Sequence, residues 1–257
     1  MKNIYVIANW KMQLNLKESV DLFNNVKQKF SYSEDMETVI CPSYTSLPDI
    51  NRCKGESKIR LGAQDVFWED VGAYTGEISC EMLKEVGCNY SIIGHSDRRK
   101  YFKESDEIVH YKLKTVLKNL LVPIVCVGET FQERQEGKKE YAVINQITKA
   151  MSGIDLLGAE EIIVAYEPIW VIGSGRAINA EEAEYMHQVI KQSLIDIFSV
   201  DIVEKCFRII YGGSINQTNI KTFLVQPNIK GVLVGGASLN PDEFLGIISE
   251  VQGAKCY

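Results

Sequence analysis

Residues 162–168, Ile-Ile-Val-Ala-Tyr-Glu-Pro, join a short apolar run to a carboxylate and a proline. Val and Ile dominate this run, as they do in parallel strands that are covered on both faces. Seven further runs of this kind lie before and after it, which gives eight in all: residues 4–8, 38–41, 59–63, 90–93, 123–127, 162–165, 207–211 and 232–234. Most are only four or five residues long, so each predicts one buried strand.

Amphipathic stretches separate these runs and predict helices. In the first stretch, four apolar residues recur at helical spacing: Leu16, Val20, Phe23 and Val26. Asn179 followed by Glu182 resembles a capping box, which predicts a helix that opens there and continues through Phe198. Residues 240–243, Asn-Pro-Asp-Glu, supply a cap, a first-turn proline and two acidic residues for the last helix.

Strands and helices therefore alternate in eight βα units, and 257 residues divided by eight gives about 32 residues a unit, close to the roughly 30 of a βα repeat. A doubly wound open sheet alternates in the same way. Eight regular units of this total length fit a closed eight-stranded parallel (β/α)8 barrel better. No Pro/Ser-rich linker or change of composition interrupts the series, so we expect one domain over residues 1–257.

The composition narrows the class of protein. Hydrophobic residues make up 46% and charged residues 24%, which argues against disorder and disulfide-dense mini-folds. No apolar run approaches the roughly 18 residues that span a bilayer, and the N-terminus lacks the pattern of a signal peptide. With a net charge of -6, and 98–100 as the longest basic cluster, a nucleic-acid partner is not expected. These observations predict a soluble, cytoplasmic protein without a membrane partner.

The cysteines give no sign of a metal site or a disulfide framework. They are odd in number, irregularly spaced, and include no Cys-x-x-Cys pair and no zinc-type Cys/His spacing. We expect reduced, mostly buried thiols at all seven positions: Cys41, Cys53, Cys80, Cys88, Cys126, Cys206 and Cys256.

Polar and glycine-rich segments follow five of the eight runs, where barrel enzymes place their chemistry. Lys11, His95 and Glu167 follow the first, fourth and sixth runs, and glycine clusters at 212–214 and 235–238 follow the last two. Each feature alone has an ordinary explanation: a solvated lysine, a structural histidine, a tight turn. Their joint placement predicts one site. Two other histidines lie inside helical patterns and are expected to be structural: His110 and His187.

These groups suit one kind of chemistry. The glycine loops expose backbone N–H groups, and a helical turn near Ser238 adds a dipole, which together predict a phosphate cradle. Lys11 adds a positive charge for an anionic substrate. Glu167 is a candidate general base, and an imidazole facing it can polarise a carbonyl. This set fits proton abstraction next to a carbonyl and needs neither a metal nor a redox cofactor.

The connection at 168–177 is longer than the usual two to six residues of a βα loop. It has a stiff start at Pro168, an apolar middle and glycines at Gly173 and Gly175. Two interpretations are open: a packed surface loop, or a lid that closes over the base and expels water.

Six segments resemble, in order, the sequence blocks of the triosephosphate isomerase family. They are Asn-Trp-Lys at 9–11, Gly-His-Ser-x-Arg-Arg at 94–99, Cys-Val-Gly-Glu at 126–129, Tyr-Glu-Pro-Ile-Trp-x-Ile-Gly-x-Gly at 166–175, Tyr-Gly-Gly-Ser at 211–214 and Val-Gly-Gly-Ala-Ser at 234–238. The fourth is highly specific, and the six together extend along the whole chain. The resemblance implies a TIM barrel and the cofactor-free, reversible interconversion of dihydroxyacetone phosphate and D-glyceraldehyde 3-phosphate, a step of glycolysis and gluconeogenesis.

The resemblance also implies roles for individual residues. Glu167 would move the proton between C1 and C2, neutral His95 would donate a hydrogen bond to the substrate oxygens, and Lys11 would stabilise the enediolate. The phosphate contacts would be Gly173, Ser214, Gly235 and Gly236, while Asn9 would support Lys11. A helix opening at Ser96 and Asp97 would place its positive end beside the imidazole.

Residues 64–77 look like the family's dimer loop, and their length and aromatic content would be unusual on a monomer. By resemblance Thr75 would reach the partner's active site, so a homodimer is expected.

This chain departs from the family pattern at several positions. Asp97 stands where Glu is usual, so we expect weaker support of Lys11 and Ser96 and a lower kcat. Differences in the loop predict altered lid kinetics: Val171, Ser174 and 176–178. Gln13 and Leu14 replace the usual Asn-Gly near the expected dimer seam.

Two other functions stay open. Another phosphate-binding barrel, such as a pentose-phosphate epimerase or a biosynthetic isomerase, shares the glycine cradle but not the Lys, His and Glu arrangement or the long loop. A catalytically inactive barrel retained for binding is favoured by Asp97 alone, and the intact Lys11, His95 and Glu167 oppose it.

Overall fold

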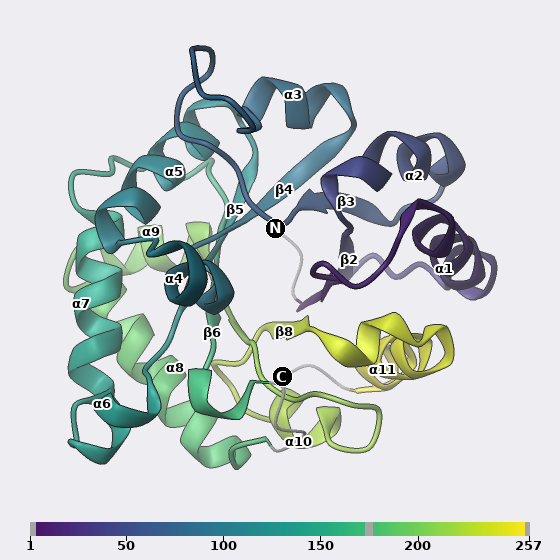
Figure 1. Ribbon diagram of the computed structural model, residues 1–257. Helices are drawn as coiled ribbons and strands as arrows, with labels where there is room; N and C mark the ends of the chain where they lie inside the picture. Colours follow the sequence, from purple (N-terminus) through teal and green to yellow (C-terminus); the bar gives the residue numbers. More distant parts are fainter. Residues whose placement is uncertain (1–3, 173–176, 255–257) are drawn as a thin grey trace.

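Eight parallel strands close into a barrel in residues 4–172 and 177–254, the part of the chain that this computed structural model describes. The strands are β1 Ile4–Asn9, β2 Met36–Cys41, β3 Arg60–Ala63, β4 Cys88–Ile93, β5 Val122–Val127, β6 Ile162–Tyr166, β7 Phe207–Tyr211 and β8 Gly231–Val234. β1 pairs with both β2 and β8, which closes the sheet. The predicted (β/α)8 barrel is confirmed, and each of the eight apolar runs forms a strand (Figure 1).

The apolar strands are buried on both faces because they separate two hydrophobic cores. Alternate side chains fill the barrel interior, where Ile7, Ile92 and Ile124 belong to one cluster. Their neighbours in sequence point outward and pack under the helices, as Val6 and Val125 do. This alternation explains why the runs read as continuous apolar stretches rather than as an alternating pattern.

Helices surround the strands and complete each unit (Figure 1). The α-helices in the described residues are α1 Leu16–Lys29, α2 Leu47–Lys54, α3 Cys80–Glu85, α4 Ser96–Phe102, α5 Asp106–Lys118, α6 Phe131–Gln135, α7 Lys139–Met151, α8 Ala180–Ile195, α9 Val200–Cys206, α10 Ile220–Leu224 and α11 Pro241–Gly253. Short 3₁₀ turns occur at η1 Tyr44–Ser46, η2 Ile169–Val171 and η3 Gly236–Leu239. The predicted first and last helices are confirmed: Phe23 and Val26 of α1 are buried, and Asn240 caps α11.

The predicted capping box at Asn179 forms only in part. The Asn179 side chain accepts the Glu182 backbone N–H at 2.7 Å, so α8 begins where expected. The Glu182 carboxylate does not return the bond, because it pairs with Arg134 and with Lys139. The expectation that the helix continues through Phe198 is wrong, since α8 ends at Ile195.

The cysteines of the described residues are all free thiols. Five are buried and Cys53 is half-buried, while Cys256 lies outside the described residues. Across residues 4–172 and 177–254, the helices are all too short or too polar to cross a membrane.

Candidate active site

A cavity of about 430 Å³ opens at the carboxyl ends of the strands. Lys11 reaches it from the loop after β1, His95 from the end of β4, and Glu167 from the end of β6. The fold thus brings together the three residues predicted to be catalytic. Most of the other predicted substrate contacts lie in its wall: Asn9, Ser214, Gly235 and Gly236. Gly173 lies outside the described residues.

The backbone of Lys11 has a left-handed conformation, with φ 52°. Such a conformation is strained for a side-chain-bearing residue, and surrounding hydrogen bonds hold it in place. The Asn9 side chain accepts the Lys11 N–H at 3.0 Å, and Gln64 donates to the Lys11 carbonyl oxygen at 2.8 Å. Asn9 thus contacts the Lys11 backbone, and its supporting role stays a prediction. The role of Gln64 was not predicted, because the contact joins residues 53 positions apart.

His95 lies two residues after β4 and caps helix α4, as predicted for a helix that opens at Ser96 and Asp97. Its Nδ1 accepts the Asp97 backbone N–H at 3.1 Å. A ring nitrogen that accepts a hydrogen bond carries no proton, so in this geometry the proton of a neutral ring sits on Nε2. Nε2 faces the cavity and lies 3.3 Å from Oε1 of Glu167. Nε2 is therefore positioned to donate a hydrogen bond at the cavity.

Glu167 is buried, and its second oxygen lies 3.4 Å from the Ser96 backbone nitrogen. Two glycines leave room for it. A Cβ on Gly212 would lie 2.7 Å from Cγ of Glu167, and a Cβ on Gly128 would collide with the Glu167 carbonyl oxygen. These positions have no side chain because the glutamate occupies the space.

The short side chain of Asp97 raised the question of whether it contacts Lys11 and Ser96, and it contacts Lys11. Its Oδ2 lies 3.0 Å from the Lys11 ammonium, so the ion pair forms. The Ser96 hydroxyl is buried and has no hydrogen-bond partner among the described residues. The expectation of weaker support therefore stays a prediction: the ion pair with Lys11 is present, and the Ser96 hydroxyl receives no hydrogen bond from Asp97. The lower kcat stays a prediction.

The glycine segments after β7 and β8 form the remaining wall. Gly236–Leu239 is a helical turn, as expected near Ser238, and the Ser238 hydroxyl donates to the Gly235 carbonyl oxygen at 2.6 Å. A Cβ added to Gly236 would have nothing within 4 Å, and one on Gly235 would approach only Lys11, at 3.8 Å. Open space thus lies against the backbone of both residues.

A polar network holds the start of the long connection after β6. Glu129 is completely buried and accepts hydrogen bonds from Tyr166 at 3.0 Å and Trp170 at 2.9 Å. Arg134 stacks over the Trp170 ring at 4.3 Å. Burial raises the pKa of Glu129, and these donors oppose the shift. The sequence showed the residues but not the network; residues 173–176, the centre of the predicted lid, lie outside the described part.

Several other lining residues were not predicted. They are apolar or amide side chains whose place only the fold reveals: Ile172, Ile215, Asn216, Leu233 and Ala237. Gln13, noted only as a departure near the dimer seam, also lines the cavity.

His110 and His187 lie away from the site, as expected. His187 is fully buried, its Nδ1 lies 2.7 Å from the Ala183 carbonyl oxygen, and burial lowers its pKa to about 4. Nδ1 of His110 lies 3.0 Å from the Ala150 carbonyl oxygen. Thr75 is exposed in the segment between β3 and α3, which extends away from the barrel (Figure 1).

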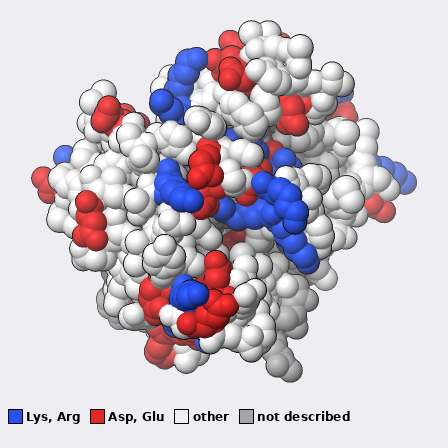
Figure 2. Space-filling view, turned by 60° about the vertical axis from the view of Figure 1, so that its left-hand side comes forward, with Lys and Arg blue, Asp and Glu red and all other residues white. Residues whose placement is uncertain are grey.

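Charged side chains are unevenly distributed over the face of the protein seen in Figure 2. Figure 2 shows Lys and Arg side chains in a band across one face, with Asp and Glu side chains gathered near it. Under the cavity, burial and then the charge of Glu167 raise the pKa of Cys126, which keeps this thiol neutral. Within the described residues, His, Cys, Asp and Glu form no cluster of three or more that could hold a metal ion.

Together these features define the class: a (β/α)8-barrel enzyme with acid–base groups at the carboxyl ends of its strands. The chain belongs to the triosephosphate isomerase family, whose sequence model matches residues 4–251. It is an isomerase that interconverts triose phosphates, a step of glycolysis.

Curated triosephosphate isomerases align with this chain over nearly their full length. A triosephosphate isomerase from Dictyoglomus turgidum is 43% identical over 248 residues, covering 96% of this chain and 99% of the relative. One from Alkaliphilus metalliredigens is 42% identical, covering 97% and 100%. One from Lactobacillus delbrueckii subsp. bulgaricus is 39% identical, covering 95% and 96%.

Proposed function

We propose that Glu167 is the base that moves a proton between C1 and C2 of a triose phosphate bound in the 430 Å³ cavity. Its burial and its place facing the imidazole support this role. Deprotonation next to the carbonyl gives an enediolate, and return of the proton to the other carbon completes the isomerisation. No cofactor takes part in this scheme.

His95 and Lys11 stabilise the charge that develops on the substrate oxygens. The Nε2–H of His95 donates to the carbonyl oxygen and then to the enediolate oxygen. The Lys11 ammonium, held by Asp97 at 3.0 Å, adds a full positive charge at the same end of the barrel. Because the Lys11 backbone is fixed by Asn9 and Gln64, this charge needs little rearrangement in the transition state.

The phosphate group binds against Ser214, Gly235 and Gly236, and Gly173, which lies outside the described residues, is proposed as a further contact by family resemblance. Backbone N–H groups beside a helical turn favour a dianion. Residues 168–177 act as the lid, which excludes water and suppresses loss of phosphate from the enediolate.

The position of His95 carries this proposal: one backbone N–H fixes its Nδ1, and its Nε2 lies 3.3 Å from Glu167. A coupled assay with D-glyceraldehyde 3-phosphate tests it. Glu167→Gln is expected to lower kcat by about 10³-fold, within the range for loss of a general base, with little change in KM. The exposed Glu107→Gln is the matched control and is expected to match the wild type.

The same assay separates the alternatives. An inactive wild type would favour the binding-only barrel and overturn this function. A wild type active only on a pentose phosphate would favour an epimerase. The Lys11–Asp97 ion pair at 3.0 Å supports an active enzyme, because the departure at residue 97 keeps the charge in place.

The protein is proposed to be a homodimer of one-domain chains (residues 1–257) in the cytoplasm, without nucleic-acid or membrane partners. Large exposed side chains support the dimer: Met12, Val71, Tyr74, Tyr101 and Phe102. They lie in segments that follow β1, β3 and β4, at the same end of the barrel as the active site. Thr75, in the same loop as Val71 and Tyr74, is proposed to reach the partner's site.

A further inference from the structure

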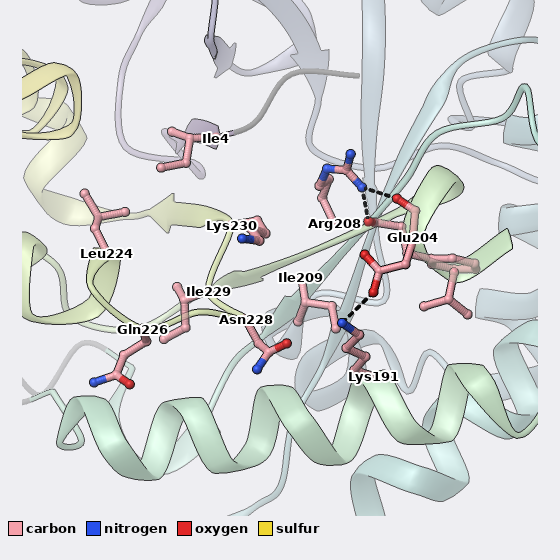
Figure 3. A pocket seen from close by; sticks show the side chains of 12 residues that line it. Ile4, Lys191, Glu204, Arg208, Ile209, Leu224, Gln226, Asn228, Ile229 and Lys230 are labelled. Carbon is pink, nitrogen blue, oxygen red and sulfur yellow. Dashed lines mark hydrogen bonds and ion pairs between the residues drawn. The ribbon is translucent and has the colours of Figure 1, made fainter. Parts of the chain in front are cut away.

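A second cavity, of about 360 Å³, lies at the opposite end of the barrel from the active site. It is bounded by the amino ends of β1 and β7, the segment leading into β8, and helices α8, α9 and α10 (Figure 3). None of its lining residues belongs to the active-site cavity, so the proposed reaction gives it no role.

Three cationic side chains and one carboxylate line this cavity: Lys191, Arg208, Lys230 and Glu204. Three positive charges and one negative charge leave two positive charges in excess. The carboxylate of Glu184 lies behind the wall, where it accepts hydrogen bonds from the side chain and backbone of Asn228. The positive charge of this cavity contrasts with the net charge of the whole chain, which is -6.

The cations are held in place by the fold. Lys191 pairs with Glu204 at 2.6 Å, and Nη1 of Arg208 donates to the Glu204 and Phe207 carbonyl oxygens at 2.9 and 2.6 Å. The backbone N–H of Lys230 donates to Ile209 in β7 at 2.8 Å. Its carbonyl oxygen accepts from β1, so the residue is fixed between two strands.

Lys230 differs from the other cations in having no side-chain partner. Its ammonium makes no hydrogen bond or ion pair to any described residue, although its charge helps Lys191 and Arg208 to lower the pKa of Glu204. An ammonium with three donors and no protein acceptor can accept an anion without first breaking an ion pair.

The cavity has room for more than a single ion. Its volume of 360 Å³ lies within the range of small-molecule sites, about 300–1,000 Å³. Figure 3 shows aliphatic side chains opposite the charged end: Ile4, Leu224 and Ile229. A small molecule with a charged head and a carbon skeleton fits this arrangement, since ligand pockets combine apolar walls with a few placed polar groups.

We propose that this cavity binds a small anion that carries at least two negative charges, such as a phosphorylated or polycarboxylated metabolite, with Lys230 as its principal contact. The ligand joins β7, β8 and β1 at their amino ends. β7 and β8 lead at their other ends into the glycine segments of the active site, so a ligand here holds together the strands that position them.

Calorimetric titration of the full-length protein with inorganic pyrophosphate at constant ionic strength tests the proposal. The wild type is expected to show two classes of site, and Lys11→Gln to weaken only the class at the active site. Lys230→Gln is expected to weaken the other class about tenfold, as for loss of one charged hydrogen bond. Glu204→Gln is expected to strengthen it, because Lys191 loses its partner and the cavity gains positive charge.

Lys205→Gln is the matched control, since this exposed lysine lies on α9 next to Glu204 but does not line the cavity. It is expected to leave both classes unchanged. Citrate in place of pyrophosphate distinguishes carboxylate from phosphate recognition, and binding of either supports the site. The proposal is overturned if Lys230→Gln and Glu204→Gln both bind as the wild type does, or if Lys205→Gln weakens binding as much as Lys230→Gln.

Discussion

Lys11 shows how single residues set up this site. Its left-handed backbone, with φ 52°, costs about 1–3 kcal/mol, and hydrogen bonds with Asn9 at the end of β1 and with Gln64 after β3 oppose that cost. The strained backbone points the ammonium toward Asp97, 3.0 Å away. The position of the charge therefore depends on backbone geometry as much as on the lysine side chain.

Residue 97 provides the first test at this scale. Asp97→Glu is expected to raise kcat roughly two- to tenfold, about 0.4–1.4 kcal/mol of barrier, with KM nearly unchanged. The longer side chain keeps the charge beside Lys11 and can also reach the Ser96 hydroxyl, which is now without a partner. Steady-state kinetics in both directions measure the effect. Unchanged kcat and KM would show that aspartate supports the site as well as glutamate does.

Gly212 provides a second test. In Gly212→Ala, the new methyl group would lie 2.7 Å from Cγ of Glu167, so the base must move. A displaced base is expected to lower kcat by about 10²-fold. Gly253→Ala is the control, since its Cβ has nothing within 4 Å. Full activity in Gly212→Ala would mean that this glycine does not govern the position of Glu167.

The sequence predicted Lys11, His95 and Glu167 because each lies within three residues of the end of an apolar run, where a barrel places its site. It did not predict Gln64, whose side chain donates to the carbonyl oxygens of Lys11 and Cys41. These contacts depend on how the segments after β1, β2 and β3 meet in the folded barrel, so no local sequence pattern predicts them.

The secondary-structure elements were predictable to the extent that their signals are local. Each strand has its own apolar run, so all eight were found within about two residues. The end of α8 was not, because the apolar pattern continues to Phe198 while the helix stops at Ile195. The missing half of the capping box was not predictable either, because the Glu182 carboxylate pairs with Arg134 of α6 rather than with the backbone of its own N-cap.

Helix α8 carries a pH-dependent element, His187. The imidazole protonates near pH 6.5 in the unfolded chain, but burial lowers its pKa to about 4 in the folded protein. Between pH 6.5 and pH 4, His187 is protonated in the unfolded chain but neutral in the folded protein. Stability is therefore complete above pH 6.5 and falls as the pH drops toward 4, with about 2 kcal/mol lost between pH 7 and pH 5.

Denaturant unfolding at both pH values, at one protein concentration, measures this loss. His187→Gln is expected to lose about 2 kcal/mol less than the wild type between pH 7 and pH 5. Packing changes common to both pH values cancel in this difference. His110→Gln is the comparison variant, since His110 is only half-buried. An equal loss in wild type and His187→Gln would show that other groups control the acid sensitivity.

At the scale of the whole molecule, a buried ionic cluster connects the protruding loop to the active site. Lys112 binds Asp65 at 2.6 Å and Glu104 at 2.8 Å, and Arg98 contacts the same two carboxylates. The second oxygen of Glu104 accepts the backbone N–H of Gly94, the residue before the imidazole, at 3.0 Å. A partner that orders residues 64–77 would therefore also steady the segment that holds His95.

Thr75, exposed in that loop, tests whether two chains are needed for activity. Thr75→Arg places a long charged side chain in the proposed interface and is expected to weaken association at least about tenfold. Sedimentation should then detect single chains at concentrations where the wild type is dimeric, with kcat per chain reduced in proportion to the fraction of single chains. Thr148→Arg, on the exposed face of α7, should change neither property. A wild type that sediments as one chain with full activity would show instead that the loop completes the site without a partner.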